Sequence, residues 1–429
     1  MAPIAAGYEP VDFHPSRYTQ PRLTNKQWVA GIIRSSGGIS RSDLALRTGI
    51  SKSGVAALVG ELLADRLVDE VFEGGRTHDL ERRRRSATLR AVLPDVLIGT
   101  IQFDHEGITV VIADMTCEPL GRAFAEARIN TAPGPLFETA AGLLRGLLST
   151  LERPEPLDAV VVALPGPIDK ATGRVRSPSV LSAWSDTDPA EELGRRLGIP
   201  VHIDNDADLG AWGEFVEGAG RPFSDFLYVE ASRGIGAGLV LDGAVYRGSA
   251  GIAGEIGHNQ VDPAGPLCRC GQNGCIEVVA SSGPVLAKLR AIRDDHAGAL
   301  ALHDFVDGVS ARVLREAGHT LGRVLAEACN LLNPQAIVIG GQLGSAHESY
   351  LEGIREAIRR YAQPVIADGL VVVAAGLGES SALTGSLIRA RHLVFDHEFR
   401  LELGGTSLPR KAHGEVTVDT GTRAAGALV

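Results

Sequence analysis

Residues 254–277 read GEIGHNQVDPAGPLCRCGQNGCIE and hold three of the chain's five cysteines within eight positions. His258 stands ten residues before Cys268, and Cys270 and Cys275 complete a Cys-x-Cys-x4-Cys pattern. One imidazole and three thiolates can close a tetrahedral shell around Zn²⁺, and the glycines let the backbone turn around the ion. The stretch therefore predicts a structural zinc site made of His258, Cys268, Cys270 and Cys275. Buried reduced thiols or a redox pair is the alternative interpretation.

The overall composition predicts a cytoplasmic protein with no membrane partner. The chain has 429 residues, of which 44% are hydrophobic and 22% charged, as is usual for globular proteins. Its first residues carry no apolar run behind a basic start, and no run reaches the roughly 18 apolar residues that a span needs. Few cysteines fit a reducing compartment. Cys117 and Cys329 lie apart from the cluster and are expected in the core.

The charge of the chain is unevenly distributed. A net charge of −10 argues against nucleic-acid binding when the chain is averaged. Six arginines nevertheless lie between Arg76 and Arg90, four of them consecutive at Arg82, Arg83, Arg84 and Arg85. A DNA backbone responds to local potential, so this stretch is a candidate phosphate-binding segment.

Residues 22–93 are expected to form a winged helix-turn-helix domain behind a flexible arm at 1–21. A helix begins after Thr24, and Ser40-x-x-Asp43 resembles a capping box that opens a short second helix. Gly49 suits a tight turn, and Ser51 caps a third helix with an apolar stripe. Helix, short helix, turn and helix is the helix-turn-helix pattern.

The outward start of the third helix supplies the expected DNA contacts Ser51, Lys52 and Ser53, which are small or donor-bearing. Two strands, RLVDEVFEG and SATLRAVL, follow and flank the arginine-rich stretch as a wing. Arg82–Arg85 are then placed to meet phosphates or enter a minor groove. The alternative interpretation is a three-helix protein–protein module with a solvated arginine loop.

Residues 94–400 alternate strands and helices, which predicts an α/β body. Lobe one is expected at about 94–222 together with a C-terminal helix, and lobe two at about 223–380. Two similar lobes suggest an actin-like (RNase H-like) sugar-kinase architecture with its site in the cleft. Residues 401–429 are rich in Gly and Thr and are expected to be a disordered tail.

The chain resembles the ROK family (repressors, open reading frames and kinases) over nearly its whole length. The resemblance rests on the cysteine motif and on several segments that occur in the family's order, namely PGPID, IDNDADLGAWGE, GIGAGLVLDGAVYRGSAGIAGEIGH, CRCGQNGCIE and LNPQAIVIGG. The N-terminal segment SRSDLALRTGISKSGVAALVGELL resembles the DNA-binding unit of the family's regulators. The resemblance implies a two-lobed body that binds a sugar.

The resemblance assigns the sugar contacts to Asn205, Asp206, Glu255, His258 and Glu277. Carboxylates and an amide suit sugar hydroxyls, which donate and accept hydrogen bonds at once. One nitrogen of the histidine could bind zinc while the other meets a sugar oxygen, so the zinc would be structural.

In the family's kinases the residue at Asp206 is the general base. Because the phosphate loop of this chain is degenerate, no catalytic residue is expected and Asp206 is a vestigial base position. For the neighbouring Asp204 and Asp208, a solvated or capping role stays open.

The phosphate loop of the family's kinases has an aspartate at the end of the first strand and two glycines in the turn. Here the segment is IQFDHEGIT, with Gln102 in the aspartate's place and Asp104, His105 and Glu106 in the turn. Two carboxylates aimed at a triphosphate repel it, and side chains block close backbone approach. Arg233 in the second phosphate segment could attract phosphate, so its effect is ambiguous.

The family's kinases commonly read Pro-Asn-Leu before a Gly-Trp near the sugar. This chain has SPSVLSAW there, with Ser179 and Ala183 in or near those places. The ligand therefore differs from plain glucose, or its affinity is altered.

These observations favour a zinc-containing, sugar-responsive repressor that binds operator DNA as a homodimer or homotetramer. The alternative is an active ATP-dependent sugar kinase with a fused DNA-binding domain, favoured by Asn205, Asp206 and the VIGG turn. A regulator that answers to a protein partner is a third possibility, which Glu255, His258 and Glu277 argue against.

Overall fold

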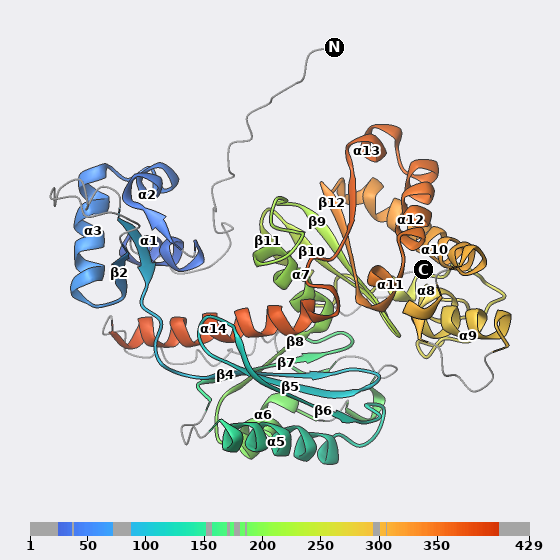
Figure 1. The fold of residues 1–429 in the computed structure, drawn as a ribbon, viewed down its shortest axis with the longest axis horizontal. Coiled ribbons are helices and arrows are strands. Elements are labelled where there is room, and N and C mark those ends of the chain that lie inside the picture. Colours follow the sequence, from blue (N-terminus) through green and yellow to red (C-terminus); the bar gives the residue numbers. More distant parts are fainter. Residues whose placement is uncertain are drawn as a thin grey trace, which may run out of the picture.

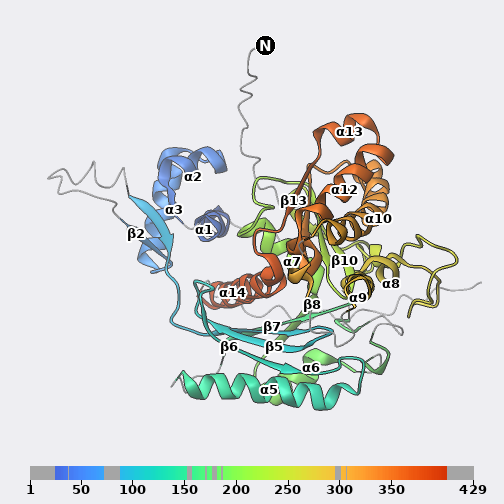
Figure 2. The same ribbon diagram turned by 45° about the vertical axis from the view of Figure 1, so that its right-hand side comes forward.

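The computed structural model describes residues 25–36, 38–71, 87–151, 157–169, 172–175, 181–184, 187–294, 301–305 and 307–402. A small N-terminal domain is followed by a body with two five-stranded sheets (Figures 1 and 2). This arrangement confirms the expected two-lobed α/β body behind a winged helix-turn-helix. The expected arm at 1–21 lies outside the described residues. Of the expected tail at 401–429, residues 401 and 402 are helical instead, and the others lie outside the described part of the chain.

The N-terminal domain follows its local sequence signals. Ser40 Oγ accepts from the backbone N–H of Asp43 at 3.2 Å, and Ser51 Oγ accepts from Gly54 at 3.1 Å, so both expected caps are confirmed. Gly49 has φ 67°, the left-handed conformation that the turn requires. The elements are α1 (Asn25–Ser35), β1 (Ile39–Ser40), α2 (Arg41–Thr48), α3 (Lys52–Ala64), β2 (Val68–Val71) and β3 (Thr88–Ala91).

The wing is the antiparallel pair β2–β3, and it confirms the two expected strands. A two-residue strand, β1, adds to the other side of β3 and was not expected. Its length is below what an alternating pattern can reveal. Residues 72–86, with Arg82–Arg85, lie outside the described part of the chain.

Lobe one is built on a sheet with the order β6-β5-β4-β7-β8, antiparallel in its first two pairs and parallel in the others. Helices α5 and α6 cover one face (Figure 1). The elements are β4 (Ile98–Phe103), β5 (Gly107–Ala113), β6 (Pro119–Glu126), α5 (Pro133–Thr150), β7 (Ala159–Leu164), η1 (Ser182–Trp184), α6 (Pro189–Leu197) and β8 (Val201–Asn205).

Lobe two repeats the same topology as β11-β10-β9-β12-β13, again with two antiparallel and two parallel pairs. Its longest helix, α10, is continuous over 25 residues. The elements are β9 (Phe226–Ala231), β10 (Ile235–Leu241), β11 (Ala244–Tyr246), η2 (Ile256–His258), α8 (Ile276–Ala280), α9 (Ser282–Ile292), η3 (Leu302–Asp304), α10 (Gly308–Leu332), β12 (Ala336–Gly340), α11 (Gly341–Ala346), α12 (Glu348–Tyr361), α13 (Pro364–Gly369), β13 (Val371–Ala374) and η4 (Gly378–Ser380).

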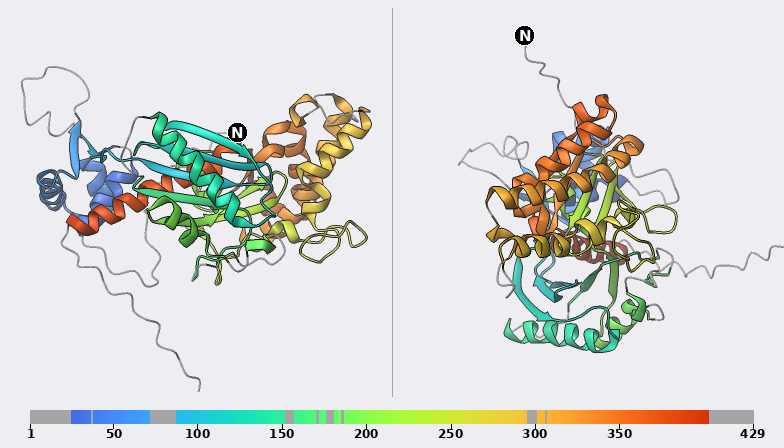
Figure 3. Two further views of the ribbon diagram at one scale, coloured as in Figure 1. Left: turned by 90° about the horizontal axis from the view of Figure 1, so that it is seen from below. Right: turned by 90° about the vertical axis from the view of Figure 1, so that its right-hand side faces the viewer.

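Two helices lie between the sheets, α7 (Asp206–Val216) and α14 (Ser381–Glu402), as Figures 1 and 3 show. Apolar residues of α14 pack on the sheet of lobe one, and those of α7 on the sheet of lobe two. The two helices cross backbone to backbone. A Cβ on Gly385 would stand 1.8 Å from the Leu209 carbonyl oxygen, and one on Gly213 would stand 2.4 Å from that of Ser381.

Glu214 fastens this crossing. Its side chain is fully buried, and its Oε1 accepts from the N–H of Leu377 and the hydroxyl of Ser381, both at 2.8 Å. Its Oε2 accepts from the N–H of Ala219 at 2.7 Å and of Gly376 at 2.9 Å. One carboxylate therefore joins the end of α7, the loop after β13 and the start of α14. None of the described helices is long and apolar enough to cross a membrane.

Candidate functional site

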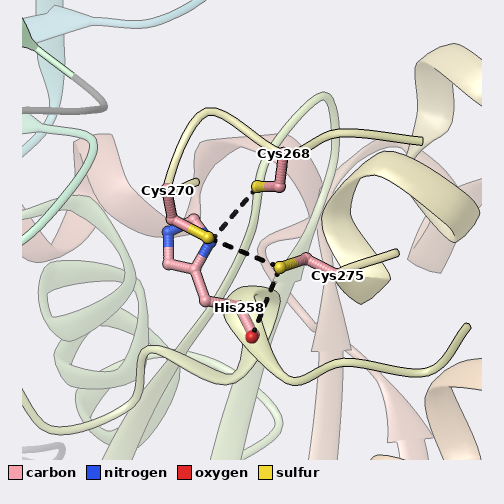
Figure 4. A group of neighbouring side chains, drawn as sticks. All are labelled: His258, Cys268, Cys270 and Cys275. Carbon is pink, nitrogen blue, oxygen red and sulfur yellow. Dashed lines mark hydrogen bonds between the residues drawn. The ribbon is translucent and has the colours of Figure 1, made fainter. Parts of the chain in front are cut away.

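The four residues of the expected zinc site lie together (Figure 4). Their candidate ligand atoms are all within 4.8 Å of one another. Cys268 Sγ is 3.6 Å from His258 Nδ1, and Cys270 Sγ is 3.5 Å from Cys275 Sγ. Tetrahedral ligands at about 2.3 Å from an ion stand about 3.8 Å apart. The cluster therefore fits a metal ion, and its sulfurs are too far apart for a disulfide.

Backbone contacts hold the cysteine loop in this shape. The N–H of Cys268 donates to the Gln272 carbonyl at 2.7 Å, and that of Gly274 donates to Pro266 at 2.7 Å. Gly274 has φ 62°, and a Cβ there would stand 1.6 Å from the Asp262 carbonyl oxygen, so only glycine fits. Cys275 is the N-cap of α8, whose first turn carries Glu277. The Cys/His cluster and a candidate sugar contact thus share one short segment.

His258 connects the Cys/His cluster to the cleft. Its Nδ1 faces the thiols, while its Nε2 lies 3.8 Å from Glu255 Oε2. The imidazole can therefore hold an ion with one nitrogen and face the cavity with the other, the division of roles expected from the sequence.

A cavity of about 440 Å³ lies between the lobes. This is within the usual size range of small-molecule sites. The five expected sugar contacts all line it, namely Asn205, Asp206, Glu255, His258 and Glu277. They come from three separate segments, the β8–α7 junction, residues 255–258 and α8, which the fold brings to one cavity.

The β8–α7 junction sets the positions of Asn205 and Asp206. Asn205 is the N-cap of α7, where its Oδ1 accepts from the N–H of Asp208 at 3.0 Å and its Nδ2 donates to the Gly166 carbonyl at 2.9 Å. Asp206 Oδ1 accepts from the N–H of Ala207 at 2.8 Å. Burial, and next the nearby Glu230 carboxylate, raise the pKa of Asp206 well above its usual value. A protonated Asp206 could donate a hydrogen bond to a ligand.

Glu255 and Glu277 form an acidic pair on the wall of lobe two. Burial, and then the charge of Glu277, raise the pKa of Glu255 to about 7. Glu277 Oε1 lies 3.6 Å from Arg269 Nε, and its Oε2 accepts a long hydrogen bond of 3.4 Å from the N–H of Ile235. Near neutral pH the Glu255 carboxyl can therefore donate as well as accept a hydrogen bond, which suits hydroxyl groups.

The β4–β5 turn, with Asp104, His105 and Glu106, also lines the cavity. Asp104 Oδ1 accepts from the N–H groups of Glu106 at 2.7 Å and Gly107 at 2.9 Å. This side chain therefore occupies the N–H groups that a glycine-rich loop would offer to phosphates. Gln102, which also lines the cavity, has a buried Oε1 with no hydrogen-bond partner in the described part of the chain.

Glu230 is a cavity residue that the sequence interpretation missed. It lies in β9, where its Oε2 accepts from the Tyr228 hydroxyl and its Oε1 from the Ser232 hydroxyl, both at 2.6 Å. Burial raises its pKa. Gly341, with φ 72°, makes room for it, since a Cβ there would stand 2.4 Å from Glu230 Oε1. The available signal was an acidic residue inside an otherwise apolar strand, FLYVEA.

Asp204 and Asp208 share a cation instead of facing solvent. Arg247 Nη2 lies 2.6 Å from Asp204 Oδ2, and its Nε lies 3.1 Å from Asp208 Oδ2. Burial raises the pKa of Asp208 to about 7, and Arg247 opposes that rise. The solvated role left open for Asp208 is therefore wrong.

Of the two positions expected near the sugar, Ala183 and Ser179, the structure describes only Ala183. Ala183 lies in η1 beside Trp184, whose fully buried ring contacts Phe103 and Phe137 edge to face. The tryptophan of this segment is thus a core residue. Ser179 lies outside the described residues.

The N-terminal domain presents a second candidate site. Ser51, Lys52 and Ser53 are all exposed at the start of α3, the position from which a recognition helix contacts base edges. Arg82, Arg83, Arg84 and Arg85 lie outside the described residues, so the wing's contribution stays a prediction.

Known proteins resemble the whole arrangement. A xylose repressor of Bacillus spizizenii is 28% identical over 367 residues, covering 85% of this chain and 94% of that protein. The DNA-binding transcriptional repressor Mlc of Escherichia coli is 26% identical over 389 residues, covering 87% and 94%.

Solved structures share the fold. A ROK family transcriptional regulator, a homolog of Escherichia coli Mlc, has a TM-score of 0.71 at 22% identity and covers 88% of this chain and 98% of that one. A ROK family glucokinase from Streptomyces griseus, in complex with glucose and AMPPNP, has a TM-score of 0.58 at 26% identity and covers 69% and 99%. The family model described as ROK family matches residues 125–392, well over half of the chain. The chain belongs to the ROK family.

Proposed function

We propose that this protein is a sugar-responsive transcriptional repressor. Its N-terminal domain binds operator DNA, and its cleft binds a sugar or sugar derivative without phosphorylating it. The observation that carries the proposal is the joining, in one chain, of an exposed recognition helix to a cavity lined by Asn205, Asp206, Glu255, His258 and Glu277. The similarity of most of the chain to the xylose repressor and to the repressor Mlc supports it.

We propose that the Cys/His cluster holds a structural Zn²⁺. His258, Cys268, Cys270 and Cys275 would supply all four ligands, which leaves no open position for a reacting group. The chemistry that zinc brings here is the fixing of His258 and of the loop before Glu277. Zinc would thereby order two of the proposed sugar contacts.

The charge of the cleft supports binding without phosphoryl transfer. Four carboxylates line the part of the cavity around the β4–β5 turn, those of Asp104, Glu106, Glu230 and Glu379. Arg122 and Arg233 also line it, but both residues are exposed. Kinases stabilise their phosphates with backbone N–H groups and cations, and this surface offers mainly negative or neutral oxygens.

A sugar kinase with a fused DNA-binding domain is the alternative function. Two features favour it, the intact Asn205–Asp206 pair and the glycine turn from β12 into α11 at Gly340 and Gly341. The likeness to the glucokinase structure adds to them.

Regulation would follow from closure of the cleft. Operators for such domains are usually two-fold symmetric, so we propose a homodimer or homotetramer with paired heads. A sugar that binds the closed form more tightly would change the spacing of those heads. It can shift DNA affinity only by its differential affinity for the two forms.

The first prediction concerns the response of DNA binding to sugar. An operator selected from random sequences by the purified protein should be released by at least one of D-xylose, D-glucose and N-acetyl-D-glucosamine, with DNA affinity falling about 5- to 150-fold. Fluorescence anisotropy measures this. Glu255→Ala should keep DNA affinity and lose the sugar response.

Charge replacements provide the control for DNA contacts. Lys52→Ala, or glutamine in place of Arg82–Arg85, should weaken binding to all sequences and flatten its salt dependence, by about 0.9 in the logarithmic slope per lost phosphate contact. Selection of no preferred sequence would count against the proposed function.

The second prediction concerns ATP. Purified protein with Mg-ATP and each of the three sugars should release no ADP above the sugar-free rate, because carboxylates replace the groups that hold phosphates. A coupled pyruvate kinase and lactate dehydrogenase assay measures this. Sustained, sugar-dependent ADP release that disappears in Asp206→Asn would establish the kinase alternative.

A further inference from the structure

The β4–β5 turn of lobe one is held rigidly in the cleft. Asp104 accepts from the two N–H groups that close the turn, at 2.7 and 2.9 Å. At Gly107 the chain runs against β6, since a Cβ there would stand 2.2 Å from the Ala125 carbonyl oxygen. The side chains at the apex, His105 and Glu106, therefore project from a fixed backbone.

Glu106 connects this turn to lobe two. Gln342 Nε2 donates to Glu106 Oε1 at 2.9 Å, across 236 residues of sequence. The amide of Gln342 is oriented from behind, because its Oε1 accepts from the Ser282 hydroxyl at 2.8 Å. The backbone N–H of Gln342 donates to Ser232 Oγ at 3.0 Å. The turn thus contacts lobe two through a glutamine that has its own anchors.

His105 then faces the wall that carries Glu277. A Cβ built on Gly234 would lie 3.7 Å from His105 Nε2 and 3.5 Å from Glu277 Oε2, so both side chains flank this glycine. Burial, and next the charges of Arg269 and Arg233, lower the pKa of His105 to about 4. A neutral imidazole has one donor and one acceptor, which matches a hydroxyl group.

A second polar atom on lobe one lacks a partner. Gln102, three residues before His105, lines the cavity with a buried Oε1 that accepts no hydrogen bond in the described part of the chain. A buried acceptor without a donor is costly, so a ligand hydroxyl would stabilise it. Both Gln102 and His105 belong to the segment that binds phosphates in the family's kinases.

We propose that His105 is a sugar-contacting, specificity-determining residue, and that Glu106 is a positioning residue that ties this contact to cleft closure through Gln342. This inference rests on the proposed sugar-binding function. The turn that binds phosphates in the family's kinases would here bind sugar hydroxyls. The sugar would be held from both lobes, by His105 on one side and by Glu255 and Glu277 on the other, which is why binding would favour the closed form.

Isothermal titration of the full-length protein with D-xylose, D-glucose and N-acetyl-D-glucosamine tests the inference. His105→Ala should weaken the best-bound sugar about 10-fold or more, as one or two lost hydrogen bonds predict. Gln342→Ala should weaken it less, about 2- to 5-fold, since it removes only the tie that positions the turn. His303→Ala is the matched control, because His303 is 81% exposed on η3 and should change nothing.

The ranking of the sugars separates a contact from a structural role. His105→Gln should bind the best sugar better than His105→Ala does and should alter the order of the three, while unfolding temperature stays unchanged. Wild-type affinity and ranking in His105→Ala would overturn the inference and leave the proposed function standing. Absence of sugar binding and of DNA release in the wild type would overturn both.

Discussion

Cys270→Ser is expected to abolish bound zinc. The four ligand atoms lie within 4.8 Å of one another, an arrangement that an ion with four protein ligands requires. A serine hydroxyl is a poor replacement for a thiolate, and structural zinc sites have apparent binding free energies of about 10–16 kcal/mol. Elemental analysis should find about one zinc per wild-type chain and almost none in the variant.

Loss of zinc should also reduce sugar affinity, by about 10-fold or more, because His258 and the segment leading to Glu277 lose their common anchor. Cys270 is partly exposed, so the serine itself has little effect on packing. Cys117→Ser serves as the matched control, since Cys117 lies in the β5–β6 turn and takes no part in the cluster. Metal-free wild-type protein, or a variant that keeps full sugar affinity, would contradict the zinc proposal.

Glu214→Ala is expected to lower the free energy of unfolding by about 3–5 kcal/mol. The substitution removes the acceptor of three backbone N–H groups and of the Ser381 hydroxyl, all within 2.9 Å. These donors belong to three segments that meet at the crossing of α7 and α14. Ser381 is fully buried and the three N–H groups are part-buried. Without the carboxylate the three N–H groups lose their acceptor, and a buried group left unpaired costs about 1–3 kcal/mol.

Urea unfolding followed by tryptophan fluorescence measures the loss, because Trp212 lies on the same helix as Glu214. Glu217→Ala is the matched control, since Glu217 is exposed at the end of that helix. Glu214→Gln keeps one acceptor oxygen and should fall between the wild type and the alanine variant. A change below about 1 kcal/mol in Glu214→Ala would show that water or neighbouring groups replace the carboxylate.

The sequence predicts most of what depends on short distances along the chain. The caps at Ser40 and Ser51 act over three residues, and the Cys-x-Cys-x4-Cys spacing specifies its own loop. Buried parallel strands such as AVVVAL are continuous apolar runs that a pattern reveals. The fold class and the residues of the Cys/His cluster could therefore be predicted from the sequence.

The roles of Glu214, Glu230 and Gln342 could not be predicted in this way. Glu214 accepts hydrogen bonds from groups 162 to 167 residues away, and Gln342 meets Glu106 across 236 residues. Nothing near Glu214 or Gln342 distinguishes them from surface glutamates and glutamines, and Glu230 differs only in lying inside the otherwise apolar strand FLYVEA. The distant partners of Glu214 and Gln342 are brought together only by the complete fold. The pairing of Asp204 and Asp208 with Arg247 belongs to the same class.

The length of α14 has a mechanical consequence. Its 22 residues extend about 33 Å. Ala382 and Leu383, in its first turn, line the cavity, and its far end lies beside the N-terminal domain in Figures 1 and 3. As a lever pivoting at Gly385, which lies about 26 Å from its last residue, it would turn a tilt of about 5° into about 2 Å of travel at that end. An adjustment small enough to leave the molecule's outline unchanged would then shift a DNA-binding head by more than half of the rise of about 3.4 Å between successive base pairs of DNA.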